Sequence, residues 1–125
     1  MDEGIEVVRN FISELQVGDV PTAASRLHED VIWHQPGRTK LSGTHSGKSV
    51  VLKLLAAFSA NHIGIEFQEA YWCDNEVLCR ILIRHRIGDR NEFQLISLNE
   101  GKISRIRHHG DTGYLSEIMR SQQAD

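Results

Sequence analysis

Three residues near the end of the sequence are of the types that acid–base chemistry uses. Arg107, His109 and Asp111 alternate along a segment expected to be extended, and alternate residues of a strand share one face. A guanidinium, an imidazole and a carboxyl group directed into one apolar cavity would form a general acid–base set. Asp111 also precedes Thr112 and a short amphipathic segment, so helix capping is an alternative role for it.

Two further histidines lie in strand-like sequence. Only one of Trp33 and His34 can point inward from a regular strand, and tryptophan is the expected inward residue, as a wall for a ligand or for the core. His34 would enter the pocket if the strand is irregular before Pro36. His85 continues an apolar strand face, where a lone histidine is either a hydrogen-bonded structural residue or part of the pocket. Tyr71 is likewise expected to place its polar hydroxyl in an apolar wall of the pocket.

The seven histidines of the sequence raise the question of a metal site. The rings of His108 and His109 would point in opposite directions from a strand, and no HExxH or short His-x-His motif is present. A site would have to assemble from distant strands, with His34, His85 and His109 beside Asp111, and nothing local supports it. We therefore predict no metal and no cofactor. The other histidines, His108 included, are expected in loop, helix-end or outward positions: His28, His45, His62 and His108.

Composition limits the class of protein. The chain has 125 residues, 40% of them apolar and 25% charged, which predicts a single globular domain over residues 1–125. A net charge of −3 argues against nucleic acid or an anionic membrane as partner. No apolar run reaches the about 20 residues of a membrane span, and the acidic start predicts no signal peptide. Cys73 and Cys79 lack the spacing of a disulfide framework or a metal motif, so we expect a reducing cytoplasm.

The first half of the chain has helical periodicity. Apolar residues recur at helical spacing over residues 4–16, and Asp19 with Pro21 predicts the start of a second helix that ends near Leu27. A short strand, 31–34, and a polar loop, 38–47, follow. A third helix is expected over residues 48–60, with Ser46 as its cap.

After residue 61 the apolar period changes from 3.6 to 2. Alternation begins at residues 63–67 and is strongest over 77–87, and further strands are expected over 93–98 and 102–109, before a short helix around 114–119. In the last strand, Ile103 and Ile106 would fall on opposite faces unless a bulge intervenes. Helices followed by long antiparallel strands predict an α+β domain in which helices cover one face of a curved sheet.

The strand 77–87 also makes a prediction about assembly. One of its faces is apolar, whereas the other mixes Leu78 and Leu82 with Arg80, Arg84 and Arg86. Such a face is too apolar for plain solvent and too charged for a core, so we expect it to form a subunit interface.

The sequence resembles the SnoaL-like polyketide cyclase family, part of the nuclear transport factor 2-like superfamily, which includes ketosteroid isomerase and limonene epoxide hydrolase. The resemblance is carried by HEDVIWHQPG at 28–37, by LSGTHSGK at 41–48 before a helix, and by GKISRIRHHGD at 101–111. It implies a cone-shaped barrel, with three N-terminal helices on a curved, mainly antiparallel sheet, a short C-terminal helix, an apolar pocket and a homodimer. It implies no particular substrate.

Within that family the last-strand aspartate is an acid/base, and Asp111 matches it. We therefore expect a cofactor-independent isomerase or cyclase acting on a small apolar carbonyl or polycyclic compound, with Asp111, His109 and His34 as catalytic candidates. The expected substrate contacts are Trp33, Tyr71, His85 and Arg107.

Two alternatives stay open. One is a non-catalytic homodimeric module that binds a small molecule or a partner in the same cone. The other is an epoxide hydrolase, which in this superfamily uses two carboxylates bridged by an arginine; Asp111, Arg107 and Glu69 would be the residues concerned.

Overall fold

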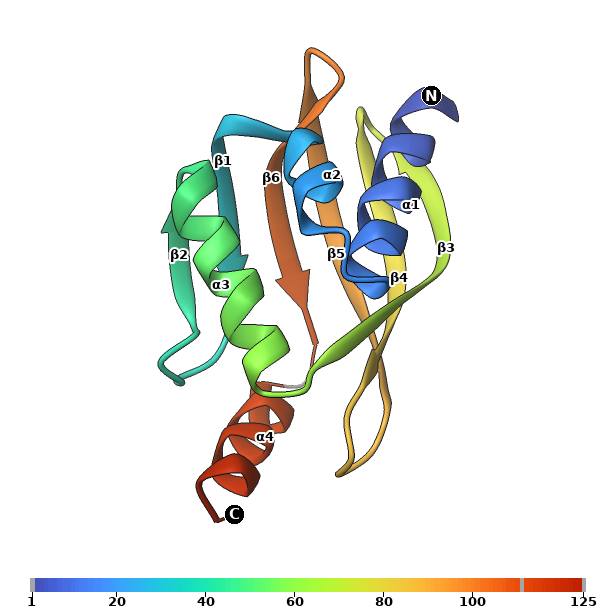
Figure 1. Ribbon diagram of the computed structural model, residues 1–125. Coiled ribbons are helices and arrows are strands. Elements are labelled where there is room, and N and C mark those ends of the chain that lie inside the picture. Colours follow the sequence, from blue (N-terminus) through green and yellow to red (C-terminus); the bar gives the residue numbers. More distant parts are fainter. Residues whose placement is uncertain (1, 111, 125) are drawn as a thin grey trace.

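The computed structural model describes residues 2–110 and 112–124. Three helices lie in the first half of the chain, α1 (Asp2–Gln16), α2 (Val20–Ser25) and α3 (Lys48–Ala60), and a fourth, α4 (Thr112–Ala124), ends it. Six strands make one sheet: β1 (Leu27–Gln35), β2 (Gly43–Ser46), β3 (Gly64–Cys73), β4 (Glu76–Arg84), β5 (Arg90–Asn99) and β6 (Lys102–His109). The α+β class expected from the sequence is confirmed (Figure 1).

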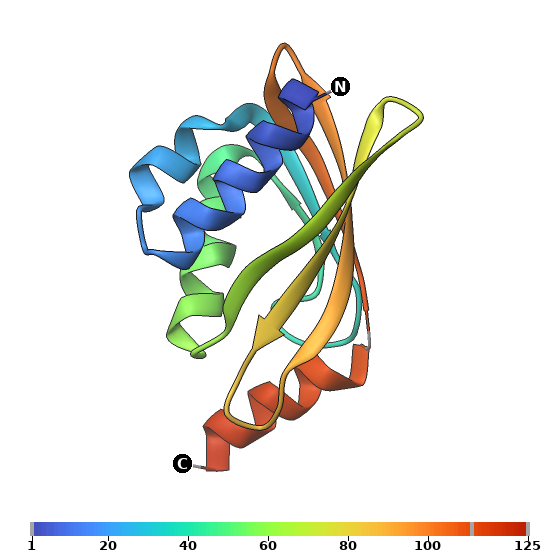
Figure 2. The ribbon, with the colours of Figure 1, turned by 90° about the vertical axis from the view of Figure 1, so that its right-hand side faces the viewer.

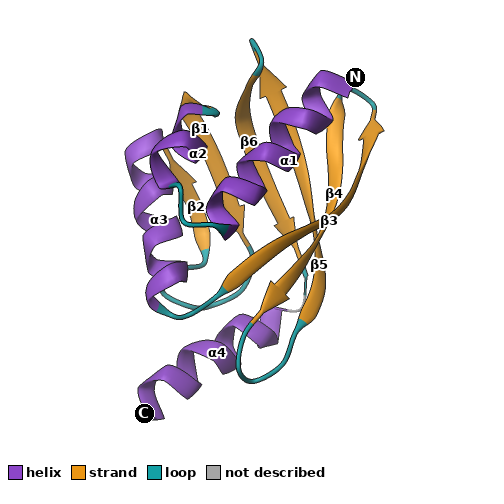
Figure 3. Cartoon of the chain, turned by 45° about the vertical axis from the view of Figure 1, so that its right-hand side comes forward, coloured by secondary structure: helices purple, strands orange, loops and turns teal. Residues whose placement is uncertain are grey.

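The sheet is curved and open, with strand order β2-β1-β6-β5-β4-β3. Every neighbouring pair in that order is antiparallel except β1 with β6, which is parallel. The helices α1, α2 and α3 lie on its concave side, and α4 lies across the lower end, beside the β4–β5 turn (Figure 2). The cone is therefore a bent sheet closed by helices, and not a closed barrel of strands (Figure 3).

The core lies between this helical layer and the sheet. Val8, Phe11 and Ile12 of α1 are fully buried, as the apolar stripe of residues 4–16 predicted. Val51 and Leu54 of α3 are buried against the other half of the sheet. Because both helices bury one face only, the sheet beneath them supplies the inward side chains that can line a cavity.

Strand β4 has the two faces that the sequence predicted. Val77, Cys79 and Ile81 are fully buried, whereas Leu78 and Leu82 are half-buried on the convex face. The strand ends at Arg84, earlier than expected, and Ile87 is 40% exposed in the turn that follows. In Figure 2 the helices of the described residues lie on the concave side and across the lower end of the sheet, and none covers the convex face.

A bulge in β6 determines which side chains enter the cone. The register with β5 shifts between Ser97 and Leu98, so that Ser97 pairs with Arg105 and Leu98 with Ile103. Ser104 is the extra residue, and Ile103 and Ile106 are both fully buried as a result. Beyond the bulge the inward positions are Ile106 and His108, and His109 faces outward.

Several element boundaries differ from those expected. Helix α2 ends at Ser25, and β1 already begins at Leu27 because the Arg26 carbonyl accepts from Ile103 N–H and draws the chain onto β6. The expected loop 38–47 contains β2, which pairs with β1. The residue before α3 is Gly47 at φ 95°, with no side-chain cap, so the expected cap at Ser46 is wrong.

The N-cap predicted for the second helix is present. Asp19 accepts a 3.4 Å hydrogen bond from Thr22 N, and Pro21 lies in the first turn.

Among residues 2–110 and 112–124, no helix has the length and apolar character needed to cross a membrane.

Candidate functional site

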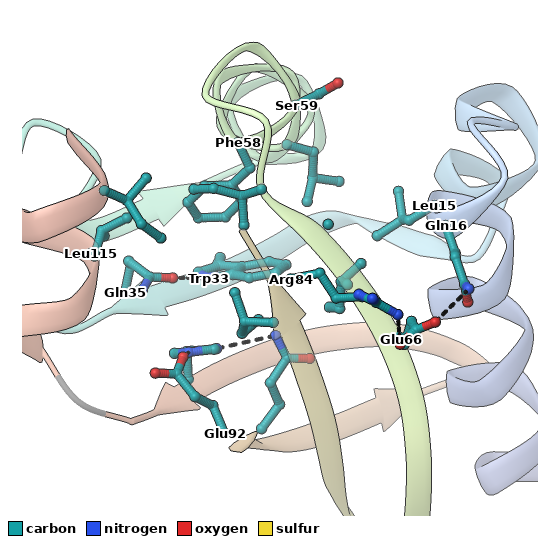
Figure 4. Close-up of a pocket in the computed structure, with 18 of the residues that line it drawn as sticks. Leu15, Gln16, Trp33, Gln35, Phe58, Ser59, Glu66, Arg84, Glu92 and Leu115 are labelled. Carbon is teal, nitrogen blue, oxygen red and sulfur yellow. Dashed lines mark hydrogen bonds and ion pairs between the residues drawn. The ribbon is translucent and has the colours of Figure 1, made fainter. Parts of the chain in front are cut away.

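The concave side of the sheet encloses a cavity of about 720 Å³. It runs from the α1–α2 turn to α4, between α3 and the strands β1, β3, β4, β5 and β6 (Figure 4). Its volume lies within the range of small-molecule sites, roughly 300–1,000 Å³. Most of its lining is aliphatic or aromatic, including Leu15, Leu52, Leu55, Ile63, Ile65, Ile83, Leu115 and Ile118.

Two aromatic side chains form its central wall. The rings of Trp33 on β1 and Phe58 on α3 have centroids 6.0 Å apart at an interplanar angle of 55°, a tilted pair of the kind that aromatic side chains favour. The Trp33 indole Nε1 donates to Gln35 Oε1 at 3.0 Å. That bond occupies the amide oxygen of Gln35, so its NH₂ group is the end that can donate to a ligand.

A buried polar cluster lies beside this wall. His108 on β6 pairs in register with Gln94 on β5, and Glu92 is two residues before Gln94 on the same face. The His108 Nε2 lies 2.5 Å from Glu92 Oε1, and the Gln94 Nε2 lies 3.3 Å from His108 Nδ1. All three are less than a tenth exposed, and all three line the cavity. An ionisable pair this deeply buried must be mutually hydrogen-bonded to be tolerated.

Gly110 makes room for the Glu92 carboxylate. A Cβ built at residue 110 would lie 2.3 Å from Glu92 Cδ and 2.4 Å from Oε2, far inside van der Waals contact. A side chain at this position would therefore displace the Glu92 carboxylate from its place beside His108.

The mouth near the α1–α2 turn has its own polar group. Arg84 Nη1 donates to Glu66 Oε2 at 3.2 Å, and Gln16 Nε2 donates to Glu66 Oε1 at 3.4 Å (Figure 4). Arg84 Nε also lies 3.7 Å from Asp89 Oδ2, and the Arg84 side chain is 56% exposed. The cation at the mouth is thus balanced by two carboxylates.

Helix α4 closes the opposite end. Leu115 and Ile118 line the cavity, and the Tyr114 hydroxyl donates to the carbonyl of Gly88 in the β4–β5 turn. The Arg90 guanidinium lies over the Tyr114 ring, 5.1 Å from its centroid. Burial raises the pKa of the Tyr114 hydroxyl, with the nearby negative charges of Asp89, Glu92 and Glu117 adding to the effect and Arg90 opposing it. Tyr114 is therefore a neutral donor that anchors the helix.

The residues expected to be catalytic lie elsewhere or cannot be placed. Asp111 lies outside the described residues. His109 is exposed on the convex side, with His34 and Arg107, and these three line a separate shallow hollow of about 310 Å³. The His34 Nδ1 is 3.0 Å from Thr44 Oγ1, and Arg107 Nη2 donates to Glu76 Oε2 at 2.8 Å. The expectation that Arg107 and His109 enter the cavity is wrong, because the bulge in β6 turns both to the convex face. His34 lies on the outer face of β1, as expected for a regular strand with Trp33 inward.

The expected substrate contacts are also divided between the cavity and other parts of the molecule. Trp33 lines the cavity. His85 is buried outside it: Nδ1 accepts from Ile87 N–H at 3.3 Å and Nε2 donates to the Asn61 carbonyl at 3.2 Å, so it is a structural histidine. Tyr71 is 54% exposed on the convex face, where its hydroxyl donates to Glu69 at 2.7 Å. Glu69 is paired with Arg80 there, so it cannot serve as the second inward acid of an epoxide hydrolase.

The polar cluster of Glu92, Gln94 and His108 was not predicted, although a signal for it exists. Fully buried Ile96 and Ile106 identify the inward faces of β5 and β6. Alternate residues share a face, so Gln94 and Glu92 lie on the inward face of β5 with Ile96, and His108 lies on that of β6 with Ile106. Apolar Phe93 and Leu95 on the convex face concealed that alternation.

Among the described residues, no three side chains of histidine, cysteine, aspartate or glutamate lie together as metal ligands would.

No family model matches the sequence, and no curated protein matches it. Solved structures do match its fold. An NTF2-like protein from Burkholderia xenovorans superposes with a TM-score of 0.76 at 23% identity, covering 94% of this chain and 95% of that one. A protein of unknown function with a cystatin-like fold from Xanthomonas campestris gives 0.84 at 26% identity, with 92% and 96% covered.

A candidate polyketide cyclase from Sinorhizobium meliloti is also similar, with a TM-score of 0.70 at 17% identity over 83% of this chain and 94% of that one. At these identities the likeness concerns the fold, since one fold hosts many reactions. The chain therefore has the fold of the NTF2-like proteins, the superfamily that its sequence resembles.

Proposed function

We propose that the protein is a cofactor-independent acid/base enzyme that moves a proton on an uncharged carbonyl compound, in the manner of an isomerase or cyclase. The observation that carries the proposal is the Glu92–His108 pair, with a 2.5 Å contact, at the wall of an otherwise apolar cavity. Carboxylates in low-polarity pockets are effective proton acceptors because little water competes for them.

Glu92 is the proposed base. Its Oε1 is held by His108, and its Oε2 lies against Gly110 with no hydrogen-bond partner among the described residues. In the forward step, Oε2 takes a proton from a carbon next to the carbonyl. The C–H electron pair forms a carbon–carbon double bond, and the carbonyl electrons move to the oxygen. Where a second carbon–carbon double bond is conjugated with this enolate, the protonated Glu92 returns its proton to the far carbon of the dienolate. The oxyanion then re-forms the carbonyl and the double bond shifts, so no external reagent is consumed.

The oxyanion formed in that step needs a donor. The Gln35 NH₂ group is available, because the Trp33 indole already occupies the amide oxygen. A preorganised amide donor stabilises developing negative charge better than mobile water does. Gln35 lines the same cavity as Glu92, and Trp33 and Phe58 provide aromatic surface against which a ring system would pack.

The cavity favours a largely apolar substrate without negative charge. Its interior carries the Glu92 carboxylate, and the Arg84 cation at the mouth is already neutralised by Glu66 and Asp89. The Glu92 carboxylate would repel an anionic ligand, and such a ligand would have to compete with Glu66 and Asp89 for Arg84. The candidate polyketide cyclase of similar fold is consistent with a carbonyl-rich ring compound.

The second candidate function is a non-catalytic ligand-binding module. It is favoured by the fact that Glu92 and His108 satisfy each other without a ligand. If the pair is only structural, the cavity binds ligands and selects them by their shape and apolar area alone.

We also propose that two copies of the chain associate through the convex face. Tyr71, Leu78, Phe93 and Leu95 lie on neighbouring strands there, and Tyr71 and Phe93 are 54% and 43% exposed. Two ion pairs lie within this face, Arg80 with Glu69 and Arg107 with Glu76. Charges that are paired within an apolar face do not repel a second copy of it.

Solvent deuterium exchange tests the catalytic proposal without a known substrate. The protein is incubated in D₂O with a panel of cyclic and aromatic ketones, and deuterium uptake next to the carbonyl is followed by mass spectrometry. Catalysed uptake by the wild type that is lost in Glu92→Gln supports the enzyme. Tight binding of panel members with no catalysed uptake would support the binding module instead.

A further inference from the structure

One member of the polar cluster, Gln94, has no titratable group. Gln94 is 1% exposed, and its Nε2 lies 3.3 Å from His108 Nδ1. Its Oε1 is buried and has no hydrogen-bond partner among the described residues. A buried amide with an unpaired oxygen is costly, and an apolar side chain would fill this position without that cost. Packing alone therefore does not account for a glutamine here.

The bond from Gln94 fixes where the imidazole proton is. With the NH₂ group of Gln94 towards the ring, as the structure has it, the amide donates and His108 Nδ1 is the accepting, unprotonated nitrogen. The ring proton is then on Nε2, which donates to Glu92 Oε1 at 2.5 Å. Gln94, His108 and Glu92 form a directed chain of two hydrogen bonds that ends on the carboxylate.

From this geometry we infer that Gln94 is a positioning residue: its amide donates to Nδ1 and so holds His108 as the Nε2–H tautomer, which donates to the carboxylate of Glu92, the proposed base. A ring protonated at Nδ1 would need an acceptor there, and in this orientation of the amide Gln94 presents its donor end. Only the role given to Glu92 rests on the proposed function; the tautomer does not.

The groups around the imidazole agree with this assignment. Glu92 contacts it on β5. Tyr114 on α4 lines the same cavity but donates its hydroxyl to Gly88, and Glu66 and Arg84 pair with each other at the mouth. Trp33 and Gln35 on β1 carry no titratable group. Among these neighbours, Gln94 is the side chain in hydrogen-bond contact with Nδ1.

The test is the nitrogen NMR signature of the His108 ring, which requires no substrate. Long-range proton–nitrogen spectra of the full chain distinguish the two neutral tautomers from the imidazolium, and a His108→Gln variant identifies the His108 signals among the seven histidines. In the wild type near neutral pH we expect one pattern, with Nε2 protonated and Nδ1 bare. A dominant Nδ1–H tautomer or an imidazolium would overturn the inference.

Three variants complete the experiment. Gln94→Met keeps the size and removes the donor, so the single-tautomer pattern should be lost. Gln94→Glu places an acceptor at Nδ1 and should convert His108 to the imidazolium. Gln94→Asn keeps the amide on a shorter side chain and serves if the methionine variant does not fold; the pattern should again be lost. An unchanged wild-type pattern in any folded variant of these three would contradict the inference.

Activity is measured separately, so the two proposals can fail independently. The expected tautomer without any deuterium exchange would leave the positioning role intact and reject the enzyme. Exchange that is unaffected in Gln94→Met, despite a changed ring signature, would remove Gln94 from the reaction while leaving Glu92 in it.

Discussion

Glu92 and His108 hold each other inside the cone: carboxylate Oε1 and imidazole Nε2 are 2.5 Å apart, with the two side chains 8% and 7% exposed. The pair spans β5 and β6 and has aromatic and aliphatic neighbours. Buried ionisable pairs are weak evidence for stability because desolvation offsets their attraction. Its position at the wall of a cavity of about 720 Å³ is the basis of the catalytic proposal.

Replacing His108 should lower the free energy of unfolding far more than replacing the neighbouring His109. His108→Ala leaves the Glu92 carboxylate buried and unpaired, which should cost about 3 kcal/mol of unfolding free energy. His109 is exposed on the convex side, so His109→Ala should change it by less than about 0.5 kcal/mol. Urea unfolding of the two variants measures both values. Equal losses would contradict the faces assigned to these residues.

Gly110→Ala should disable the site while preserving the fold. The new methyl would meet the Glu92 carboxylate at 2.3–2.4 Å and displace it, and a displacement near 1 Å can reduce catalysis by about 100-fold. Deuterium exchange measures the effect. Gly64→Ala is the matched control, since it adds a methyl elsewhere on the cavity wall, where the Cβ would meet Arg84 at an ordinary 3.5 Å. Undiminished exchange in Gly110→Ala would argue against Glu92 as the base.

The two cysteines should differ in reactivity. Burial raises the pKa of Cys79 to about 12, and the thiolate is the reactive form. Cys73 is exposed at the end of β3. A thiol reagent at mildly alkaline pH should therefore modify Cys73 in the native protein and both cysteines after denaturation. Rapid native modification of Cys79, identified by peptide mass, would show that β4 is more open than described.

Glu76 should stabilise the fold in a pH-dependent way. The Ser97 hydroxyl, then Arg107 and Arg105, lower its pKa below the ordinary 4.5 despite partial burial. Because the folded-state pKa is depressed, its contribution is complete above the unfolded-state value and is lost as pH falls through the folded-state value.

The Glu76→Gln variant tests this sign. It should be less stable than the wild type by about 1 kcal/mol near neutral pH, the modest size reflecting partial solvent exposure. The difference should shrink as the pH falls below the ordinary value of 4.5 and through the lower folded-state pKa. Thermal unfolding across that range provides the measurement, and a gap that widens in acid would refute the assignment.

The convex face predicts a dimer. Light scattering at micromolar concentration should give about twice the chain mass of 14.2 kDa. Leu78→Glu would bury a charge in the interface and should give monomers, whereas the same change at exposed Val17, in the α1–α2 turn, should not affect association. A wild-type mass near 14.2 kDa would reject the interface.

Local patterns in the sequence were sufficient for much of the fold. Helical spacing predicted α1 and α3, and the alternation of β4 predicted both of its faces, because each of these elements buries one regular stripe. The strand β2 has only four residues, all polar or glycine, and is ordered by pairing with β1. The parallel contact of β1 with β6 joins distant segments, which no local pattern specifies.

The site was harder to predict because it depends on one inserted residue. The sequence indicated a bulge between Ile103 and Ile106, but the faces of Arg107, His108 and His109 were counted without it. One extra residue in a strand exchanges every side chain beyond it between the two faces. His109 was therefore expected where His108 lies, and its partner Glu92 was missed with it.

The central claim is that Glu92 abstracts a proton from a ligand in the cavity, and one comparison tests it most directly. For a ketone that the wild type both binds and deuterates in D₂O, the affinity and exchange rate of Glu92→Gln are measured side by side. The amide keeps the size and loses the basic oxygen, so affinity should be nearly unchanged while exchange falls by about 100-fold or more. Equal exchange rates at saturating ligand would contradict the claim.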